Sequence, residues 1–308
     1  MGVRAEKRSN AGIYVECLID GRMDDVWRLT QNPELHQRWD LRFTEIRYLP
    51  RPTESEPQQF LYETRIGFGL AIAGTGESVG ERVDKDGNAA SSLRFRSDDP
   101  KSLIRTGGGY WRYLPIETGM RFLTWYDYEV RFGMVGRLVD RLVFRPLIGW
   151  ATAWSFDRLR LWVEEEQSPE MSFAFAAIHA VARLAIAFIW LWHGLVPKLI
   201  FRDLQEKIML TQSGASVSLL PWVGGAEIVF AALILLTWRQ RGILLLNIAL
   251  MMIALGAVAL RSPGYLWGAF NPVTLNIAVI ALSMMGWLAA ARSPFAGRCL
   301  RVAPKGDA

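Results

Sequence analysis

The chain has 308 residues, enough for two domains, and 51% of them are hydrophobic. Its net charge of +5 hides a contrast, because residues 1–170 carry 24 basic and 26 acidic side chains whereas residues 171–308 carry 11 and 4. The basic surplus therefore lies in the apolar half, where it suits anionic lipid headgroups, and the first half lacks the basic run expected of a nucleic-acid-binding protein.

The chain contains two cysteines, Cys17 and Cys299, which we expect to lie in different domains and to stay unpaired. The sequence has no spacing typical of metal ligands, of a flavin site or of haem attachment, so it names no cofactor. Residues 1–12 have no apolar core and do not resemble a secretory signal, which favours a cytoplasmic first half.

The first half opens with alternating apolar residues at 13–19, the pattern of a strand. Two short helices are predicted next, over 23–29 and 34–39, and Asn32-Pro33 marks the start of the second. Six β-like runs follow between Gly, Pro and Asp turns, at 43–49, 60–66, 76–83, 91–96, 109–113 and 121–131. From Val135 the apolar period becomes helical, and Pro146 is expected to kink this long helix.

This order of elements predicts an α+β helix-grip domain, in which an antiparallel sheet curls around a long C-terminal helix and leaves a cavity. The segments IYVECLIDGRMDDVWRLTQNPELHQRW, GGYWRYLPIETGMRFLTWYDYEV and FDRLRLWVEE resemble the SRPBCC superfamily of START-like and polyketide-cyclase-like domains, over residues 11–166. The resemblance implies a helix-grip fold with a hydrophobic pocket. Members of the superfamily bind lipids, sterols or polyketides and some catalyse cyclisation, so no single reaction is implied.

The candidate ligand-pocket residues in this half are Trp111, Tyr113, Trp125 and Asp127. A carboxylate in an apolar cavity can act as an acid or base because burial raises its pKa. The alternatives are that the aromatic residues form the core and that Asp127, with Glu129 and Arg131, lies on an outward polar strand face. His36 is expected at the surface or in a structural role, with the pocket mouth as the alternative. No acid–base constellation emerges, so the catalytic residues are unknown.

Four long apolar stretches fill the second half, at 175–201, 219–238, 243–260 and 273–290. Each is about as long as the ~20 residues that a helix needs to cross ~30 Å of hydrocarbon. We predict an all-α four-transmembrane-helix bundle over residues 175–292. A polar linker at 167–174 joins it to the first domain, and a cytoplasmic tail at 293–308 follows it.

Basic residues near the ends of the spans predict the topology. If the first domain is cytoplasmic, the inside segments carry six basic residues and the outside loops carry four. The inside set is Arg239, Arg241, Arg292, Arg298, Arg301 and Lys305, and the outside set is Lys198, Arg202, Lys207 and Arg261. We therefore expect a multi-pass protein of the cell (inner) membrane with both termini in the cytoplasm.

Polar residues inside the spans are costly in lipid, so each is a candidate functional residue. The predicted polar cluster on the outer side comprises His193, Lys198, Glu227, Asn271 and Asn276. His193 and Glu227 both lie about 12 Å below the outer surface, and Glu227 at that depth needs a partner or a proton. Gly224 and Gly225 would let the first span approach closely. The alternative is that these residues only lock the helices together.

Three more polar residues lie toward the inner ends of the spans. His179 and Arg183 are expected to contact lipid headgroups, with Arg183 extending its charge to the membrane surface, and Asn247 is expected to satisfy helix packing. His179 and His193 share one helix and lie about 21 Å apart along it. They therefore cannot hold one haem from both sides.

The segments WLWHGLVPKLIF, LPWVGGAEI and GAFNPVTLN resemble the DoxX-like family of small four-helix membrane proteins, over residues 175–292. The wider relatives of that family include a subunit linked to quinone-coupled thiosulfate oxidation. The resemblance thus implies a four-helix bundle and a loose association with quinone chemistry, although the chain itself has no redox CxxC.

Three functions stay open. The first is an integral membrane protein whose cytoplasmic domain binds a hydrophobic, lipid-like ligand, which the membrane domain anchors or exchanges with the bilayer. The second is a quinone- or proton-linked redox membrane subunit, with Glu227 as proton carrier and His193 as its hydrogen-bond partner. The third is a cyclase-type enzyme, although we expect the chain not to be an enzyme by itself. The expected partners are membrane lipids and an apolar small molecule, with a membrane partner subunit or a second copy also open.

Overall fold

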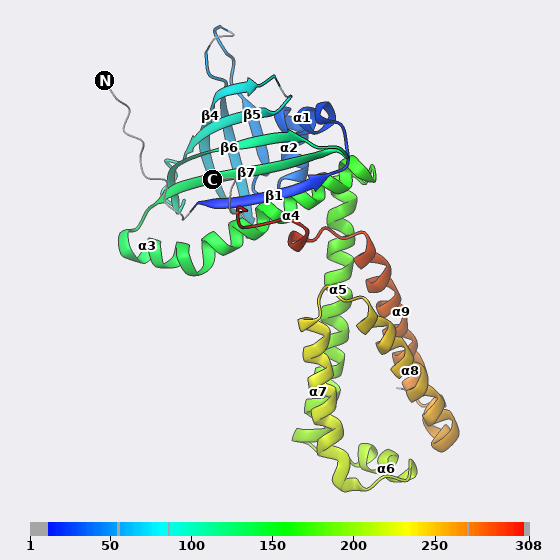
Figure 1. Ribbon diagram of the computed structural model, residues 1–308. Coiled ribbons are helices and arrows are strands. Elements are labelled where there is room, and N and C mark those ends of the chain that lie inside the picture. Colours follow the sequence, from blue (N-terminus) through cyan, green and yellow to red (C-terminus); the bar gives the residue numbers. More distant parts are fainter. Residues whose placement is uncertain (1–11, 54–55, 86, 270, 305–308) are drawn as a thin grey trace. The chain divides into compact units, whose positions relative to one another are not determined.

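The computed structural model describes residues 12–53, 56–85, 87–269 and 271–304 (Figure 1). The chain divides into two compact units. The sheet unit comprises Met1–Ser172 and Pro294–Ala308, and the helical unit comprises Phe173–Ser293. Each unit is described by itself.

A single antiparallel sheet forms the body of the sheet unit (Figure 1). Its strand order is β1-β7-β6-β5-β4-β3-β2, so each strand from β2 to β7 lies beside its neighbour in sequence and β1 closes the edge beside β7. The strands are β1 (Ile13–Ile19), β2 (Glu45–Tyr48), β3 (Gln59–Gly67), β4 (Leu70–Val83), β5 (Ala89–Arg96), β6 (Ile104–Pro115) and β7 (Met120–Val130).

Two groups of helices complete the unit. Between β1 and β2 lie α1 (Met23–Gln31) and α2 (Pro33–Trp39), and the Asn32 side chain caps α2 by accepting hydrogen bonds from the backbone of Glu34 and Leu35. After β7 come α3 (Gly133–Val139), the π-helical turn η1 (Asp140–Phe144) and α4 (Arg145–Glu164), which packs on β1. This is the predicted helix-grip architecture. The π-helical turn η1 directly precedes α4, in which Pro146 is the second residue.

The core of the sheet unit lies between α4 and the β1, β6 and β7 side of the sheet. The alternating residues of β1 point inward, as predicted, and Val15 is fully buried. The ring of Phe122 on β7 stacks on Phe156 of α4 with ring centres 4.5 Å apart, and Trp39 packs edge-on against the same Phe156 ring. These contacts fix α4 against one side of the sheet.

The end of the chain returns to the sheet unit instead of forming a separate tail over 293–308. The backbone of Leu300 pairs with Glu16 of β1 through two hydrogen bonds of 2.9 Å, and the backbone N–H of Phe295 donates to Asp157 of α4 at 2.7 Å. The last four residues of the predicted tail, 305–308, lie outside the described residues. A tail that adds backbone pairs to an edge strand carries no local signature, because its partners lie far away in the sequence.

The prediction that Cys17 and Cys299 lie in different domains is therefore wrong. Both thiols are free and buried in the sheet unit, and Cys299 donates to the carbonyl of Ala153 at 3.3 Å. A hydrogen bond with Cys299 and burial together raise the pKa of Cys17 well above its ordinary value. Cys17 is thus held as a protonated, weakly nucleophilic thiol.

The predicted linker at 167–174 contains the start of a helix. The hydroxyl of Ser168 accepts a hydrogen bond from the backbone of Met171, and Pro169 begins helix α5 (Pro169–His193). Arg158 of α4 donates to the carbonyl of Pro169 at 2.8 Å. The Ser-Pro pair is a helix start, in which Ser caps and Pro takes the first position.

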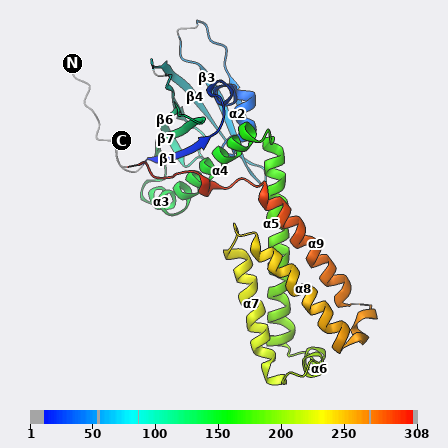
Figure 2. The same ribbon diagram turned by 45° about the vertical axis from the view of Figure 1, so that its right-hand side comes forward.

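The helical unit contains the predicted long apolar helices. After α5 come η2 (Gly194–Ile200), α6 (Leu204–Gln212), η3 (Val217–Leu219), α7 (Leu220–Leu236), α8 (Gly242–Arg261), η4 (Pro263–Trp267) and α9 (Pro272–Ala291). Among the described residues, four helical segments are long and apolar enough to cross a membrane, namely Pro169–Ile200, Val217–Leu236, Gly242–Arg261 and Pro272–Arg298. Figure 2 shows α5, α7, α8 and α9 running alongside one another.

A small apolar core joins these helices. Ile186 and Ala187 of α5 pack against Ile234 of α7 and Leu244 of α8, with Trp190 and Phe230 beside them. Most other large apolar side chains of the four helices are exposed on the outside of the unit, as hydrocarbon-facing residues are.

Candidate functional sites in the sheet unit and in the helical unit

The structure places the four predicted pocket residues on opposite faces of the sheet. Trp111 and Tyr113 of β6 point inward and are buried. Trp125 pairs in register with Tyr110 and lies on the outer face, where the two rings stack 6.0 Å apart. Because side chains alternate along a strand, the two pairs cannot line one pocket.

Asp127 shares the outer side of β7 with Trp125, as the alternative interpretation expected. Its Oδ1 accepts a hydrogen bond from Arg145 at 3.1 Å, so the carboxylate is already paired. On the same strand face, Glu129 is exposed and accepts a hydrogen bond from Thr106, while Arg131 donates to backbone carbonyls. This face is polar and gives no acid or base inside an apolar cavity.

A buried polar network occupies the inside of the sheet unit. Asp40 accepts two hydrogen bonds from Arg42, at 2.9 Å from Nε and 2.6 Å from Nη2, and His36 Nε2 lies 3.0 Å from the same carboxylate. The Arg42 guanidinium rests over the Tyr126 ring, 5.4 Å from its centre. The Tyr126 hydroxyl in turn hydrogen-bonds to Thr152 of α4 at 2.9 Å. Three chain segments, residues 36–42, β7 and α4, are thus joined through one charged pair.

The electrostatics of the network follow from burial and pairing. Burial by itself would raise the pKa of Asp40, but Arg42 and His36 outweigh it and hold the pKa well below its usual range. Burial lowers the pKa of His36 despite the neighbouring carboxylate. His36 is therefore neutral at pH 7 and donates its Nε2–H to Asp40, because an ionised carboxylate can only accept. Its ring is enclosed by Trp39, Phe43 and Trp111, with ring centres 5.0–5.3 Å away. Of the two expected positions, surface or structural, His36 therefore has the structural one.

The inward-pointing side chains of the sheet are buried over some strands and only half-buried over others. Over β1, β6 and β7 the inward residues are buried, whereas Phe60, Tyr62 and Phe95 of β3 and β5 stay half-buried although they point the same way. Their rings lie across glycines of the neighbouring strands. A Cβ on Gly76, for example, would stand 2.2 Å from the Phe60 ring. The glycines let the aromatic rings lie flat across the neighbouring strands.

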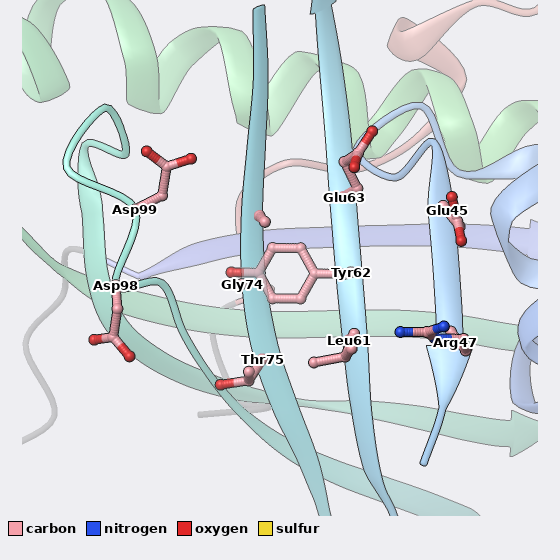
Figure 3. A pocket seen from close by; sticks show the side chains of 10 residues that line it. Glu45, Arg47, Leu61, Tyr62, Glu63, Gly74, Thr75, Asp98 and Asp99 are labelled. Atoms are coloured by element: carbon pink, nitrogen blue, oxygen red, sulfur yellow. The ribbon is translucent and has the colours of Figure 1, made fainter.

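A groove of about 540 Å³ lies on the opposite, outer face of β2, β3 and β4 (Figure 3). Its lining residues are Glu45, Arg47, Leu61, Tyr62, Glu63, Ala73, Gly74, Thr75, Asp98 and Asp99. Four of these are carboxylates, and each of them is paired with an arginine or a lysine. Nowhere in the described part of the chain do three or more His, Cys, Asp or Glu side chains come together to hold a metal ion.

In the helical unit, three charged residues of η2, α6 and α7 meet. Lys198 Nζ lies 3.2 Å from Glu206 Oε1 and 3.1 Å from Glu227 Oε2, and it also donates to the carbonyl of His193 at 3.4 Å. The Lys198 side chain is only 9% exposed. Glu227 therefore has the cationic partner that its depth required, and Lys198 is held between two carboxylates. We call Lys198, Glu206 and Glu227 the charged triad.

Close helix contact makes the triad possible. A Cβ on Gly194 would stand 2.6 Å from the carbonyl of Gly224, and a Cβ on Gly224 would stand 2.8 Å from the carbonyl of Gly194. A Cβ on Gly225 would meet nothing within 4 Å. Gly224 thus has the predicted role and Gly225 does not. Lys198 itself lies in η2, a π-helical turn that contains Pro197.

The other members of the predicted outer cluster bind elsewhere. Asn271 caps α9 by accepting from the backbone of Thr274 at 3.0 Å and donates to the carbonyl of Gly268. Asn276 is buried and donates to Met251 of α8 at 3.5 Å. Phe270, part of the FNP segment, lies outside the described residues. Glu206 on α6 was missed because a charged residue between spans is expected in water.

The expectation that Arg183 reaches toward the lipid headgroups is wrong. Arg183 is fully buried and donates to the carbonyls of Ile234 and Gln240, at and just beyond the end of α7. Its Nε also donates to His179 Nε2 at 3.1 Å, and His179 Nδ1 lies 3.0 Å from the carbonyl of Gly286 on α9. The last carbonyls of a helix have no partner within the helix, so a buried guanidinium is well placed to satisfy them.

Asn247 has the packing role that was expected. It accepts a hydrogen bond from the Trp190 indole of α5 and donates to Ser283 of α9, both at 2.7 Å. One buried amide on α8 thus joins three helices. Hydrogen bonds of this kind help to hold membrane helices together where the hydrophobic effect does not.

Comparison with known proteins defines the family. The chain is 45% identical over 233 residues to the uncharacterized membrane protein YndG of Bacillus subtilis (strain 168), which covers 75% of this chain and 80% of that protein. The chain belongs to the same family as YndG. Residues 187–284 also match the DoxX-like family. The protein is therefore a membrane protein with a DoxX-like segment that contains Lys198, Glu206 and Glu227.

Several solved structures are similar to about half of the chain. TTHA0849 from Thermus thermophilus is 19% identical, with a TM-score of 0.38 over 51% of this chain and 99% of that one. The di-domain aromatase/cyclase StfQ of the steffimycin biosynthetic pathway is 16% identical, with a TM-score of 0.40 over 51% of each chain. A STAR-related lipid transfer protein from Xanthomonas axonopodis is 14% identical, with a TM-score of 0.40 over 52% of this chain and 90% of that one.

Proposed function

We propose that the protein is a membrane-anchored binding protein for an apolar or amphiphilic small molecule, held by the sheet unit. The observation that carries this proposal is the partly open inward face of the sheet. Phe60, Tyr62 and Phe95 point toward the inside of the grip yet remain half-buried. Aromatic side chains on an inner face that helices do not fill are the usual lining of an apolar site.

The buried network supplies a polar end for such a ligand. The rings of His36 and Phe43 lie 5.3 Å apart, and those of Phe43 and Tyr62 lie 5.6 Å apart, which links the network to the open part of the face. Asp40 neutralises Arg42, and His36 is uncharged. The network therefore favours an uncharged polar group, such as a hydroxyl or carbonyl, over a carboxylate or phosphate.

The location we propose is the cell (inner) membrane, with the sheet unit and both termini in the cytoplasm. The support is the excess of basic residues in the segments that would then face inward. Cysteine-accessibility labelling in intact cells tests it. A single cysteine at Arg202 should react with a membrane-impermeant maleimide from outside, whereas one at Arg301 should react only after the cells are opened.

The ligand proposal is tested on the full chain purified in nanodiscs. Extraction followed by mass spectrometry should find a stoichiometric apolar molecule, and a fluorescent fatty alcohol should compete with it. Tyr62→Arg places a charge on the inward face and should abolish binding. Leu61→Arg is the matched control, because Leu61 is the neighbouring half-buried residue of β3 and successive side chains of a strand point to opposite faces. The proposal would be contradicted if both variants lost ligand binding equally, or if the unmodified protein held no bound molecule.

A second candidate function rests on the charged triad. We infer that a proton or quinone head could exchange at Glu227, because Lys198 lies between two carboxylates in a π-helical turn, a local structure frequent at functional sites. Glu227→Gln should then abolish quinone binding or proton uptake while the protein stays folded. Unchanged binding and uptake in folded Glu227→Gln would reduce the triad to a packing role.

A further inference from the structure

The segment after β7 exposes an unusual amount of apolar surface. We call this set the apolar ridge, and its side chains are 43–78% exposed. The apolar ridge comprises Phe132, Met134, Val135, Leu138, Val139, Leu142, Val143, Leu147 and Trp150. Soluble surfaces rarely leave a contiguous patch of this kind uncovered, because water does not solvate it well.

The ridge belongs to a helix with two distinct faces. Gly136, Asp140 and Gly149 are buried against the sheet unit, while the ridge residues between them project outward. The exposed charged residues of the segment 132–150 are Arg137 and Arg141. Asp140, the single acid of the segment, is buried and binds Arg145 at 3.0 Å. The exposed surface is therefore apolar and basic, without an exposed carboxylate.

A second exposed apolar group lies in a turn at the end of the sheet from which the ridge helix starts. The β3–β4 turn presents Phe68, which is 105% exposed, between Ile66 and Leu70, which are both more than half exposed. Phe68 has φ 51° between two glycines with positive φ, so the turn holds the ring away from the sheet. The antiparallel register puts this turn, the end of β5 and the end of β7, from which the ridge helix starts, at one end of the sheet.

We propose that the apolar ridge, together with Phe68, docks into the headgroup region of an anionic bilayer. A helix with one apolar face and basic flanking residues binds at the boundary between headgroups and acyl chains. Arg137 and Arg141 complement anionic headgroups. The chain also enters the membrane only a few residues after α4, at α5, and returns after α9. Two covalent connections to the spans keep the ridge at a high effective concentration near a bilayer.

The proposal is independent of the proposed ligand, since it concerns only the outside of the sheet unit. The test uses the full chain in nanodiscs that contain zwitterionic and anionic phospholipid. Leu138→Cys carries an NBD label on the ridge. Leu18→Cys on β1 is the matched control, because both leucines are 58% exposed. Cys17 and Cys299 are buried, and protein without an introduced cysteine measures their background labelling.

If the ridge docks, the nitroxide lipid and aqueous iodide should rank the two labels in opposite order. A nitroxide lipid should quench the label at residue 138 several-fold more than the label at residue 18, and aqueous iodide should quench the label at residue 18 more. Combining Arg137→Gln with Arg141→Gln should lower the ratio of docked to free ridge by roughly fivefold per arginine. Omitting the anionic lipid should have a similar effect.

Two results would overturn the proposal. Equal iodide quenching at both positions would place the ridge in water. Protection from iodide at residue 138 without quenching by the nitroxide lipid would mean that protein covers the ridge, from a second copy or another subunit. Neither result depends on whether the sheet unit binds a ligand.

Discussion

In the sheet unit, the buried charges of Asp40 and Glu16 are matched by arginine side chains, Arg42 and Arg121. In the helical unit, the buried Arg183 is matched mainly by backbone carbonyls at the end of α7. The difference follows from the groups around each charge. A buried carboxylate needs a donor, and because the β1 backbone is paired along the strand, Glu16 takes its donor from the Arg121 side chain. Arg183 is itself a donor and can use free carbonyls. In a membrane bundle, the helix ends are the unpaired groups.

The largest expected effect on stability comes from breaking the ion pair between Asp40 and Arg42. Asp40→Ala leaves Arg42 and His36 without their shared acceptor, and we expect a loss of about 3–5 kcal/mol in the free energy of unfolding of the sheet unit. Hydrogen exchange of β7 peptides in the full chain measures it. Asp98→Ala, at an exposed position, is the control and should change little. A loss under about 1 kcal/mol would mean that the network contributes little.

Replacing Arg183, which donates to backbone carbonyls, should have a smaller effect on stability. Arg183→Leu frees two helix-end carbonyls but also relieves the burial of a cation, so we expect a loss of about 2–3 kcal/mol in the helical unit. Unfolding by SDS titration in mixed micelles measures the change. Arg261→Leu, an exposed arginine at the end of α8, is the matched control. If both variants lose the same stability, Arg183 does not act by capping α7.

The close approach of η2 to α7 can be tested with two adjacent glycines. Gly224→Ala places a methyl group 2.8 Å from the carbonyl of Gly194 and should cost about 1–3 kcal/mol through overpacking. Gly225→Ala meets open space and should be neutral or slightly stabilising, because Ala favours the helix. The same SDS titration separates them. Equal behaviour of the two variants would argue against the close contact.

The smallest expected effect is the pH dependence from His36. Burial lowers the pKa of His36 in the folded protein, so the unfolded chain binds more protons than the folded one below about pH 6.5. Stability of the sheet unit should therefore fall as the pH drops from about 7 to 5. His36→Gln should flatten this part of the profile. Hydrogen exchange of β7 peptides at both pH values measures it, and an unchanged slope in His36→Gln would assign the effect to another group.

Much of the candidate site in the membrane could be anticipated, and little of the network in the sheet unit. Lys198 and Glu227 stood out because charges are rare inside apolar spans. Asp40 and Arg42 did not, because charged residues in a soluble domain are normally exposed. Tyr126, which lies under Arg42, is far from it in the sequence. Only the curling of the sheet brings the two together.

The element order, the helix-grip class, the four apolar helices and their polar exceptions can all be predicted from the amino-acid sequence. These features follow from local periodicity and from the length of a helix that crosses a bilayer. The tertiary structure alone decided that Trp111 and Trp125 face opposite ways in the folded sheet, that the chain end pairs with β1, and that Arg183 caps α7. The physical reason is that burial and pairing depend on contacts between distant segments, for which the local pattern carries no signal.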